Sequence, residues 1–114
     1  MIALWVAVGA AVGAPLRFAL GSRLDSDRFP LGIWLANVVG STVVGLVGGL
    51  GLGDAPMALV GIGFCGAFTT YSAFATECVD RGLSRGAMYA AATVGCALAG
   101  CFLGFWLGDL LAQA

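Results

Sequence analysis

The sequence has 114 residues, of which 61% are hydrophobic and only 10% are charged, and its formal net charge is −1. This composition excludes a disordered chain, differs from that of a soluble domain and provides no basic patch for nucleic acid. The few charged residues separate four long apolar stretches, each close to the ~20 residues that a membrane-spanning helix needs. We therefore predict an all-α membrane protein, with four transmembrane helices in a single domain over residues 1–114.

The first two transmembrane helices are expected over about residues 2–20 and 31–52. Gly9 and Gly13 form a G-x-x-x-G pair, which either allows another helix to approach closely or reflects chance spacing in a glycine-rich span. Asn37 is the only strongly polar residue in the first half of the second helix. An unpaired carboxamide is unfavourable in a membrane, so Asn37 is expected to face the bundle interior, as a contact between helices or as part of a pathway.

The third helix is expected over about residues 57–80, with a break near residues 66–70. The stretch 63–77 lies in an apolar segment and yet holds glycines, two adjacent threonines and a serine. Lipid cannot hydrogen-bond to freed backbone groups, so such a stretch must be enclosed by protein or line a cavity. Tyr71 and Phe74 are three residues apart, which places both rings on one helix face. The stretch predicts a narrow polar pathway between helices.

The fourth helix is expected over about residues 86–111. Tyr89 and Thr93 are four residues apart and share a helix face. The sequence contains no histidine, no nucleophile–base constellation and no cofactor motif, and its four cysteines form no C-x-x-C pair, so it indicates neither an enzyme nor a zinc site. A helix-packing seam is indicated by three glycines at intervals of four: Gly100, Gly104 and Gly108.

The basic residues are distributed unevenly between the two membrane sides. The side with the termini and the connection between helices 2 and 3 has no basic residue and carries Asp54 and Asp109. Positive charge in short loops tends to remain in the cytoplasm. We therefore expect a multi-pass protein of the cell inner membrane, with loops 1–2 and 3–4 cytoplasmic and both termini outside. All five basic residues fall on the side of those two loops: Arg17, Arg23, Arg28, Arg81 and Arg85.

Three stretches resemble the Fluc/CrcB family of fluoride channels: residues 9–17, 30–40 and 66–74. The family's third-helix pattern is approximately Gly-Gly-x-Thr-Thr-Phe-Ser-Thr-Phe with a glutamate soon after. This chain reads Gly-Ala-Phe-Thr-Thr-Tyr-Ser-Ala-Phe over residues 66–74, followed by Glu77, so Tyr71 departs from the pattern. The resemblance covers nearly the whole chain. It implies a fluoride-selective ion channel that passively exports cytoplasmic fluoride and so relieves its toxicity.

The resemblance also implies an antiparallel dimer with two fluoride pathways and a structural sodium ion at the dimer axis. By position, the main-chain carbonyls of Gly66 and Thr69 would bind the sodium ion. Amide and hydroxyl donors and the positive edges of aromatic rings can replace the water of a small anion and still hold it weakly enough for release. The pathway implied by position has seven lining residues: Asn37, Thr70, Tyr71, Ser72, Phe74, Tyr89 and Thr93.

The arginine bias bears on the partner. Family members with little bias insert both ways and form homodimers, whereas other members occur as two related chains of fixed, opposite orientation. We therefore expect an oppositely oriented homologue in preference to a homodimer, with fluoride ion and membrane lipid as the other partners.

Two alternative functions remain open. A small multidrug-resistance-type cation/proton antiporter has the same length and number of spans, but it needs a membrane-embedded carboxylate, typically in helix 1. Helix 1 has none, and Glu77 lies near a helix end. A non-transporting subunit of a larger complex would leave the break in helix 3 without a purpose.

Overall fold

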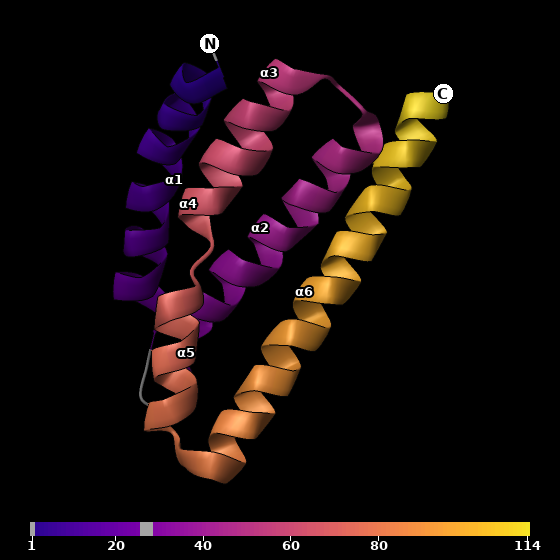
Figure 1. The fold of residues 1–114 in the computed structure, drawn as a ribbon. Helices are drawn as coiled ribbons and strands as arrows, with labels where there is room; N and C mark the ends of the chain where they lie inside the picture. Colours follow the sequence, from indigo (N-terminus) through magenta and orange to yellow (C-terminus); the bar gives the residue numbers. More distant parts are fainter. Residues whose placement is uncertain (1, 26–28) are drawn as a thin grey trace.

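The computed structural model describes residues 2–25 and 29–114, so Asp27 and Arg28 of the first loop lie outside the described part. The chain folds into helices throughout, with α1 (Ile2–Leu24), α2 (Leu31–Leu50) and α6 (Gly82–Gln113) as single elements. Together with the segment Asp54–Asp80, the described residues form four spans long and apolar enough to cross a membrane. The predicted all-α, four-span architecture of an integral membrane protein is confirmed (Figure 1).

The third span is broken, as predicted, and the break is confined to Thr69 and Thr70. Both residues have extended backbone angles, with φ −78°, ψ 159° at Thr69 and φ −147°, ψ 124° at Thr70. Gly66, where the expected break begins, is still helical. From its start to its end, the span consists of α3 (Asp54–Pro56), the π-helix η1 (Met57–Cys65), α4 (Gly66–Phe68), the break, and α5 (Tyr71–Asp80).

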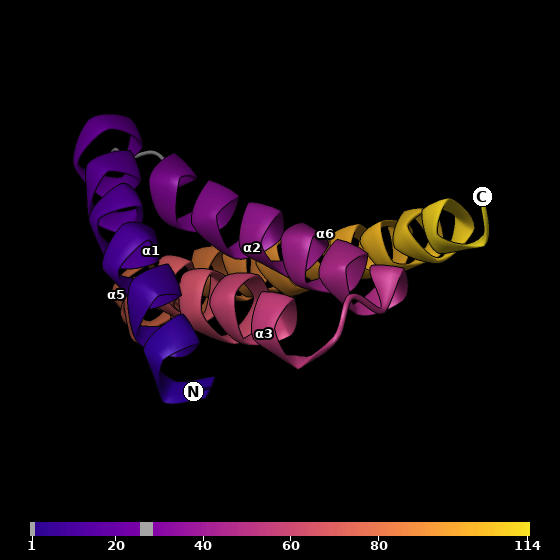
Figure 2. The ribbon, with the colours of Figure 1, turned by 90° about the horizontal axis from the view of Figure 1, so that it is seen from above.

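The ends of the spans gather at the two ends of the bundle. Both termini and the connection between α2 and α3 lie at one end, whereas the connection between α5 and α6 lies at the other (Figure 1). Seen from above, α1 and the C-terminal part of α6 lie at opposite edges of an arrangement that measures 44 × 28 × 19 Å (Figure 2). This flattened shape leaves both edge helices largely uncovered.

Glycines allow the spans to approach one another closely. A Cβ atom on Gly9 would collide with the carbonyl oxygen of Leu59, and one on Gly13 with that of Phe64. The G-x-x-x-G pair of α1 therefore packs directly against the third span. The predicted seam of α6 is also confirmed, because Cβ atoms on Gly100, Gly104 and Gly108 would collide with Thr42 and Leu46 of α2.

Two helices extend further toward the loop end than expected from the sequence. The first ends at Leu24 instead of near residue 20, because Gly21, Ser22 and Arg23 continue the helix. An arginine in a last turn interacts favourably with the negative end of the helix dipole. The last helix begins at Gly82, immediately after the tight turn, and not near residue 86.

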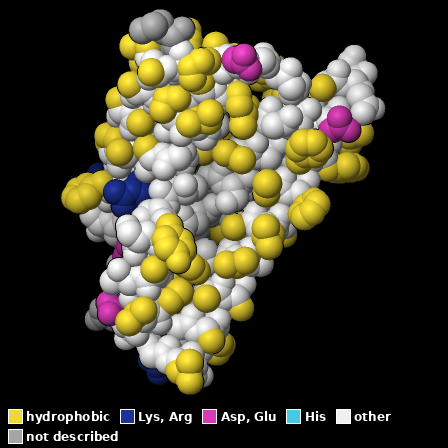
Figure 3. Space-filling view, viewed as in Figure 1, with side chains coloured by type: hydrophobic (Ala, Val, Ile, Leu, Met, Phe, Trp, Pro, Cys, Tyr) yellow, Lys and Arg dark blue, Asp and Glu magenta, His cyan; other side chains and the backbone are white. Residues whose placement is uncertain are grey.

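The surface of the single chain is strongly apolar. Hydrophobic side chains spread over the whole visible face, with few charged groups among them (Figure 3). Large hydrophobic residues on α1 and α6 are among the most exposed, with Phe18 72% and Phe102 77% exposed. Such a surface suits lipid or another apolar chain as its surroundings.

Candidate functional site

The Asn37 side chain is bonded to the backbone of the helix break. Its Oδ1 atom accepts a hydrogen bond of 2.7 Å from the Thr70 N–H, and its Nδ2 atom donates one of 3.1 Å to the Thr70 carbonyl. The Thr70 N–H would have bonded to the Gly66 carbonyl in an unbroken helix. A single carboxamide on α2 therefore replaces backbone bonds that the break removes from the third span.

The Thr70 hydroxyl starts the second half of the broken span. As the N-cap of α5, it accepts a hydrogen bond of 3.2 Å from the Ala73 N–H. Threonine is a favoured residue at this position, because its side chain satisfies a backbone donor that has no partner inside the helix. Thr70 is thus hydrogen-bonded to α2 through its backbone and to α5 through its side chain.

A cavity of about 260 Å³ opens beside the break, and we name it the break groove. Five of the predicted pathway residues line it, namely Asn37, Thr70, Tyr71, Phe74 and Thr93. Ser72 is exposed and does not line it, because adjacent residues point in different directions on a helix. Sequence reasoning missed three further lining residues, Ser41, Val94 and Ala97, and it assigned the fourth, Thr69, to the sodium site only.

Aromatic rings form a row from the break to α6. The ring centroids of Tyr71 and Phe74 are 6.3 Å apart, and those of Phe74 and Tyr89 are 5.6 Å apart. The spacing of three residues between Tyr71 and Phe74 correctly placed these two rings together. Tyr71 is 80% exposed, so the row is covered at the α6 end and open at the break end.

Tyr89 and Thr93 are the buried polar side chains of α6, with exposed fractions of only 3% and 4%. Their hydroxyl groups lie near each other, but neither forms a hydrogen bond of acceptable geometry within the described part of the chain. A buried hydroxyl without a partner is unfavourable by about 1–3 kcal/mol. Two of them in one turn of α6, beside the Phe74 ring, mark a polar track suited to a small ligand.

A second cavity, of about 190 Å³, lies between α2 and the helical segments that precede the break, and we name it the carbonyl groove. Ser41 and Thr69 line both cavities, and Gly66 lines only this one. The N–H and the hydroxyl of Thr69 both donate to the Cys65 carbonyl, at 2.9 and 2.8 Å. The backbone carbonyls after Cys65 belong to the last turn of α4. Because the helix ends there, no N–H groups of a following helical turn can bond to them.

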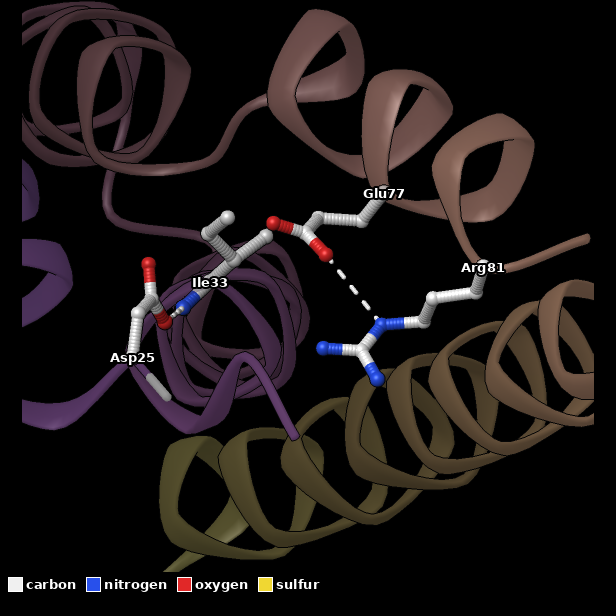
Figure 4. Close-up of polar contacts among 4 residues, drawn as sticks. All are labelled: Asp25, Ile33, Glu77 and Arg81. Atoms are coloured by element: carbon white, nitrogen blue, oxygen red, sulfur yellow. Dashed lines mark hydrogen bonds and ion pairs between the residues drawn. The ribbon is translucent and has the colours of Figure 1, made fainter. Parts of the chain in front are cut away.

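The loop end of the third span carries an ion pair that the sequence interpretation did not identify. The Arg81 Nε atom lies 3.1 Å from the Glu77 Oε2 atom, at the i,i+4 spacing that could have revealed it (Figure 4). The Arg81 guanidinium also lies 5.9 Å from the centroid of the Tyr89 ring. In the same region, the Asp25 Oδ1 atom accepts a hydrogen bond of 3.1 Å from the Ile33 N–H in the first turn of α2 (Figure 4).

Comparison with known proteins identifies the family. A family model described as "CrcB-like protein, Camphor Resistance (CrcB)" matches residues 4–108. A Rhodococcus jostii protein named fluoride-specific ion channel FluC 2 is 44% identical, over 94% of this chain and 98% of its own length. A Natronomonas pharaonis protein of the same name is 43% identical, over 97% of each chain. Geobacillus kaustophilus fluoride-specific ion channel FluC 1 is 39% identical, over 92% of this chain and 96% of its own.

These relatives bear the names of ion channels and not of enzymes, in agreement with the expectation from the sequence. The family match extends into all four spans, and it includes the whole broken third span and the α6 residues that line the break groove. The chain therefore belongs to the CrcB-like family, as the resemblance of its sequence implies.

Proposed function

We propose that this chain is a fluoride-selective ion channel that passively exports cytoplasmic fluoride. The observation that carries the proposal is the break groove. It brings the Asn37 amide, the Thr70 and Thr93 hydroxyls and two aromatic rings to one cavity within a chain whose relatives are named fluoride channels. Amide and hydroxyl groups can donate hydrogen bonds to fluoride in place of water, and ring edges present positive charge to it.

Weak sites favour conduction over trapping. Among the described residues, those that line the groove carry neutral side chains and include no arginine or lysine. An ion must bind favourably enough to enter and weakly enough to leave, and neutral donors meet both conditions. Fluoride enters cells as neutral hydrogen fluoride and dissociates inside, so its own gradient and the membrane potential suffice for export. In the inferred orientation, the arginine-bearing loops are cytoplasmic and both termini are outside the inner membrane.

We further propose an antiparallel dimer. The break groove is open at the surface of the single chain, and Tyr71 at its edge is 80% exposed. A second chain would cover this opening and enclose the pathway, as polar backbone at membrane depth requires. The basic residues of the described part, Arg17, Arg23, Arg81 and Arg85, all belong to the loop side. This bias favours an oppositely oriented homologue over a second copy of the same chain.

The carbonyl groove suits a structural sodium ion at the dimer axis. Gly66 and Thr69, the positions implied by the resemblance, line the same cavity at the end of α4. The described residues contain no cluster of three or more His, Cys, Asp or Glu side chains, so a cation here would rely on carbonyl oxygens. Sodium is a hard cation that such oxygens suit, as at the unwound helices of transporters. The ion would hold the two broken helices together and take no part in the path of fluoride.

The antiporter alternative finds no support in the structure. Proton-coupled exchange needs a carboxylate available inside the membrane. Glu77, the one candidate, is paired with Arg81 at 3.1 Å near the end of α5. An acid held by an arginine at a helix end is poorly placed to exchange protons with a substrate pathway.

The proposal is tested by growth in fluoride of cells that lack their own fluoride export. The chain is expressed alone and together with an oppositely biased homologue, and the amount in the membrane is measured. We expect resistance from the parent chain, or from the pair, and loss of resistance for Asn37→Asp at equal membrane amount. Unchanged sensitivity in both arrangements, with normal amounts of protein in the membrane, would overturn the proposed function.

A further inference from the structure

A third cavity lies where the loop end of the bundle meets α6. It has a volume of about 260 Å³, and we name it the arginine vestibule. Its wall combines two positively charged side chains with two aromatic rings and two small or flexible apolar residues. The lining residues are Phe29, Arg81, Arg85, Met88, Tyr89 and Ala92.

The vestibule adjoins the break groove through aromatic contacts. Tyr89 lines the vestibule, and its ring centroid is 5.6 Å from that of Phe74, which lines the break groove. Thr93, one turn further along α6, also lines the break groove. Tyr89 therefore lies between the vestibule and the polar track.

Two acidic side chains near the vestibule, Glu77 and Asp25, have partners among the described residues. Glu77 is bound to Arg81, and Asp25 accepts a hydrogen bond from the Ile33 N–H at the positive end of α2. The exposed side chain of Arg85 has no hydrogen-bond or ion-pair partner in the part of the chain that the structure describes. Arg85 is thus a cation at the cavity whose charge no described residue balances.

Tyr89, which lines the vestibule, carries a buried hydroxyl. Only 3% of the Tyr89 surface is exposed. Its hydroxyl forms no hydrogen bond of acceptable geometry to a described residue. Phe29 packs against the same ring edge-on, with centroids 5.5 Å apart, and Arg81 lies over it. These contacts fix the ring and leave its hydroxyl as a donor for a ligand.

We propose that the arginine vestibule is the loop-side mouth of the fluoride pathway, in which Arg85 concentrates the anion and the Tyr89 hydroxyl passes it to the break groove. This inference rests on the proposed channel function and adds a residue for anion capture to it. A cation at the mouth of a cavity raises the local concentration of anions and the rate at which they enter. Because Arg85 lies outside the break groove, its full charge does not trap the ion inside the pathway.

The test compares fluoride efflux from liposomes for four proteins at equal protein amounts: the parent chain, Arg85→Gln, Arg85→Lys and Arg23→Gln. Arg23 is a matched control, because it is an exposed loop-side arginine that does not line the vestibule. If the parent chain needs its oppositely oriented homologue, all four are measured with it. Efflux is recorded at about 10 mM and about 300 mM ionic strength, where charges are screened beyond about 30 Å and about 6 Å.

We expect Arg85→Gln to reduce efflux about fivefold at the low ionic strength, which is the effect of one charge at about 4 Å in water. The reduction should shrink at the high ionic strength, and Arg85→Lys and Arg23→Gln should resemble the parent chain. If Arg85→Gln and Arg23→Gln give equal efflux while the parent chain gives normal efflux, the proposed role of the vestibule would be overturned. The proposed channel function would be unaffected by that result. Absence of parent efflux in every arrangement would overturn the channel function and the vestibule with it.

Discussion

Asn37 forms two hydrogen bonds with one residue, Thr70, and both are with its backbone. The carboxamide accepts from the N–H and donates to the carbonyl, so it matches the two groups that a break in a helix leaves without partners. This pair joins α2 to the third span at the point where the break groove opens. Asn37 therefore positions the groove, and one of its two amide hydrogens is not used in these two bonds.

Asn37→Ala should destabilise the fold by about 1–3 kcal/mol, because it removes two hydrogen bonds and leaves a partly buried N–H and carbonyl unpaired. Thermal unfolding in detergent measures the change. Ser41→Ala is the control, since Ser41 lines the same groove without a hydrogen bond to a described residue. Equal melting temperatures for the two variants would contradict the role assigned to the Asn37–Thr70 pair.

Gly104→Ala should weaken the packing of α6 on α2. A Cβ at this position would collide with the Thr42 carbonyl, and overpacking of this kind typically destabilises by about 1–3 kcal/mol. Gly95→Ala on the same helix is the matched control, because a Cβ there meets nothing within 4 Å. Alanine is a better helix former than glycine, so the control should be neutral or slightly stabilised. Thermal unfolding of both variants is measured in the same detergent. An equal loss of stability in the two would contradict close packing of α6 on α2 at Gly104.

Thr93→Val should separate function from stability. Valine has nearly the same shape and removes a buried hydroxyl that lacks a partner, so the fold should keep or gain stability. Fluoride efflux should fall about tenfold, corresponding to ~1.4 kcal/mol lost by the ion on its path. The exposed residue Thr76 provides the control as Thr76→Val. Unchanged efflux for Thr93→Val would remove Thr93 from the pathway.

The Tyr71 hydroxyl should be dispensable. The side chain is 80% exposed at the edge of the break groove, and its ring lies 6.3 Å from that of Phe74. Tyr71→Phe keeps the ring and its positive edge, so efflux should remain within about twofold of the parent, whereas Tyr71→Ala should reduce it further. Loss of efflux in Tyr71→Phe would show that the hydroxyl itself acts on the ion or on the partner chain.

The sequence predicts the break in the third span because polar residues at membrane depth have few stable environments. It also predicts the glycine seam of α6, since a spacing of four follows the helix repeat, whereas it left the contact of Gly9 and Gly13 open. The sequence did not predict the exact site of the break. Glycine is the stronger helix breaker by residue type, and yet Gly66 remains helical. The position of the break depends on Thr70 meeting Asn37, a contact between residues 33 positions apart.

Other features of the site also depended on tertiary contacts. No local pattern distinguishes the π-helix Met57–Cys65 from an α-helix. The Glu77–Arg81 pair has a recognisable spacing, but its place beside Tyr89 follows from the sharp turn at Gly82, where φ is +86°. Ser72 lies next to Tyr71 in sequence and on another helix face, outside the break groove of the single chain, so its place in the pathway stays a prediction.

The central claim is tested most directly by fluoride efflux from liposomes that contain the purified chain, with chloride as the control ion. The account predicts fluoride efflux without chloride efflux, either from the chain alone or after addition of an oppositely biased homologue. Efflux that appears only with the homologue would identify the heterodimer. Fluoride retained by folded protein in both arrangements, or chloride released as fast as fluoride, would contradict the account.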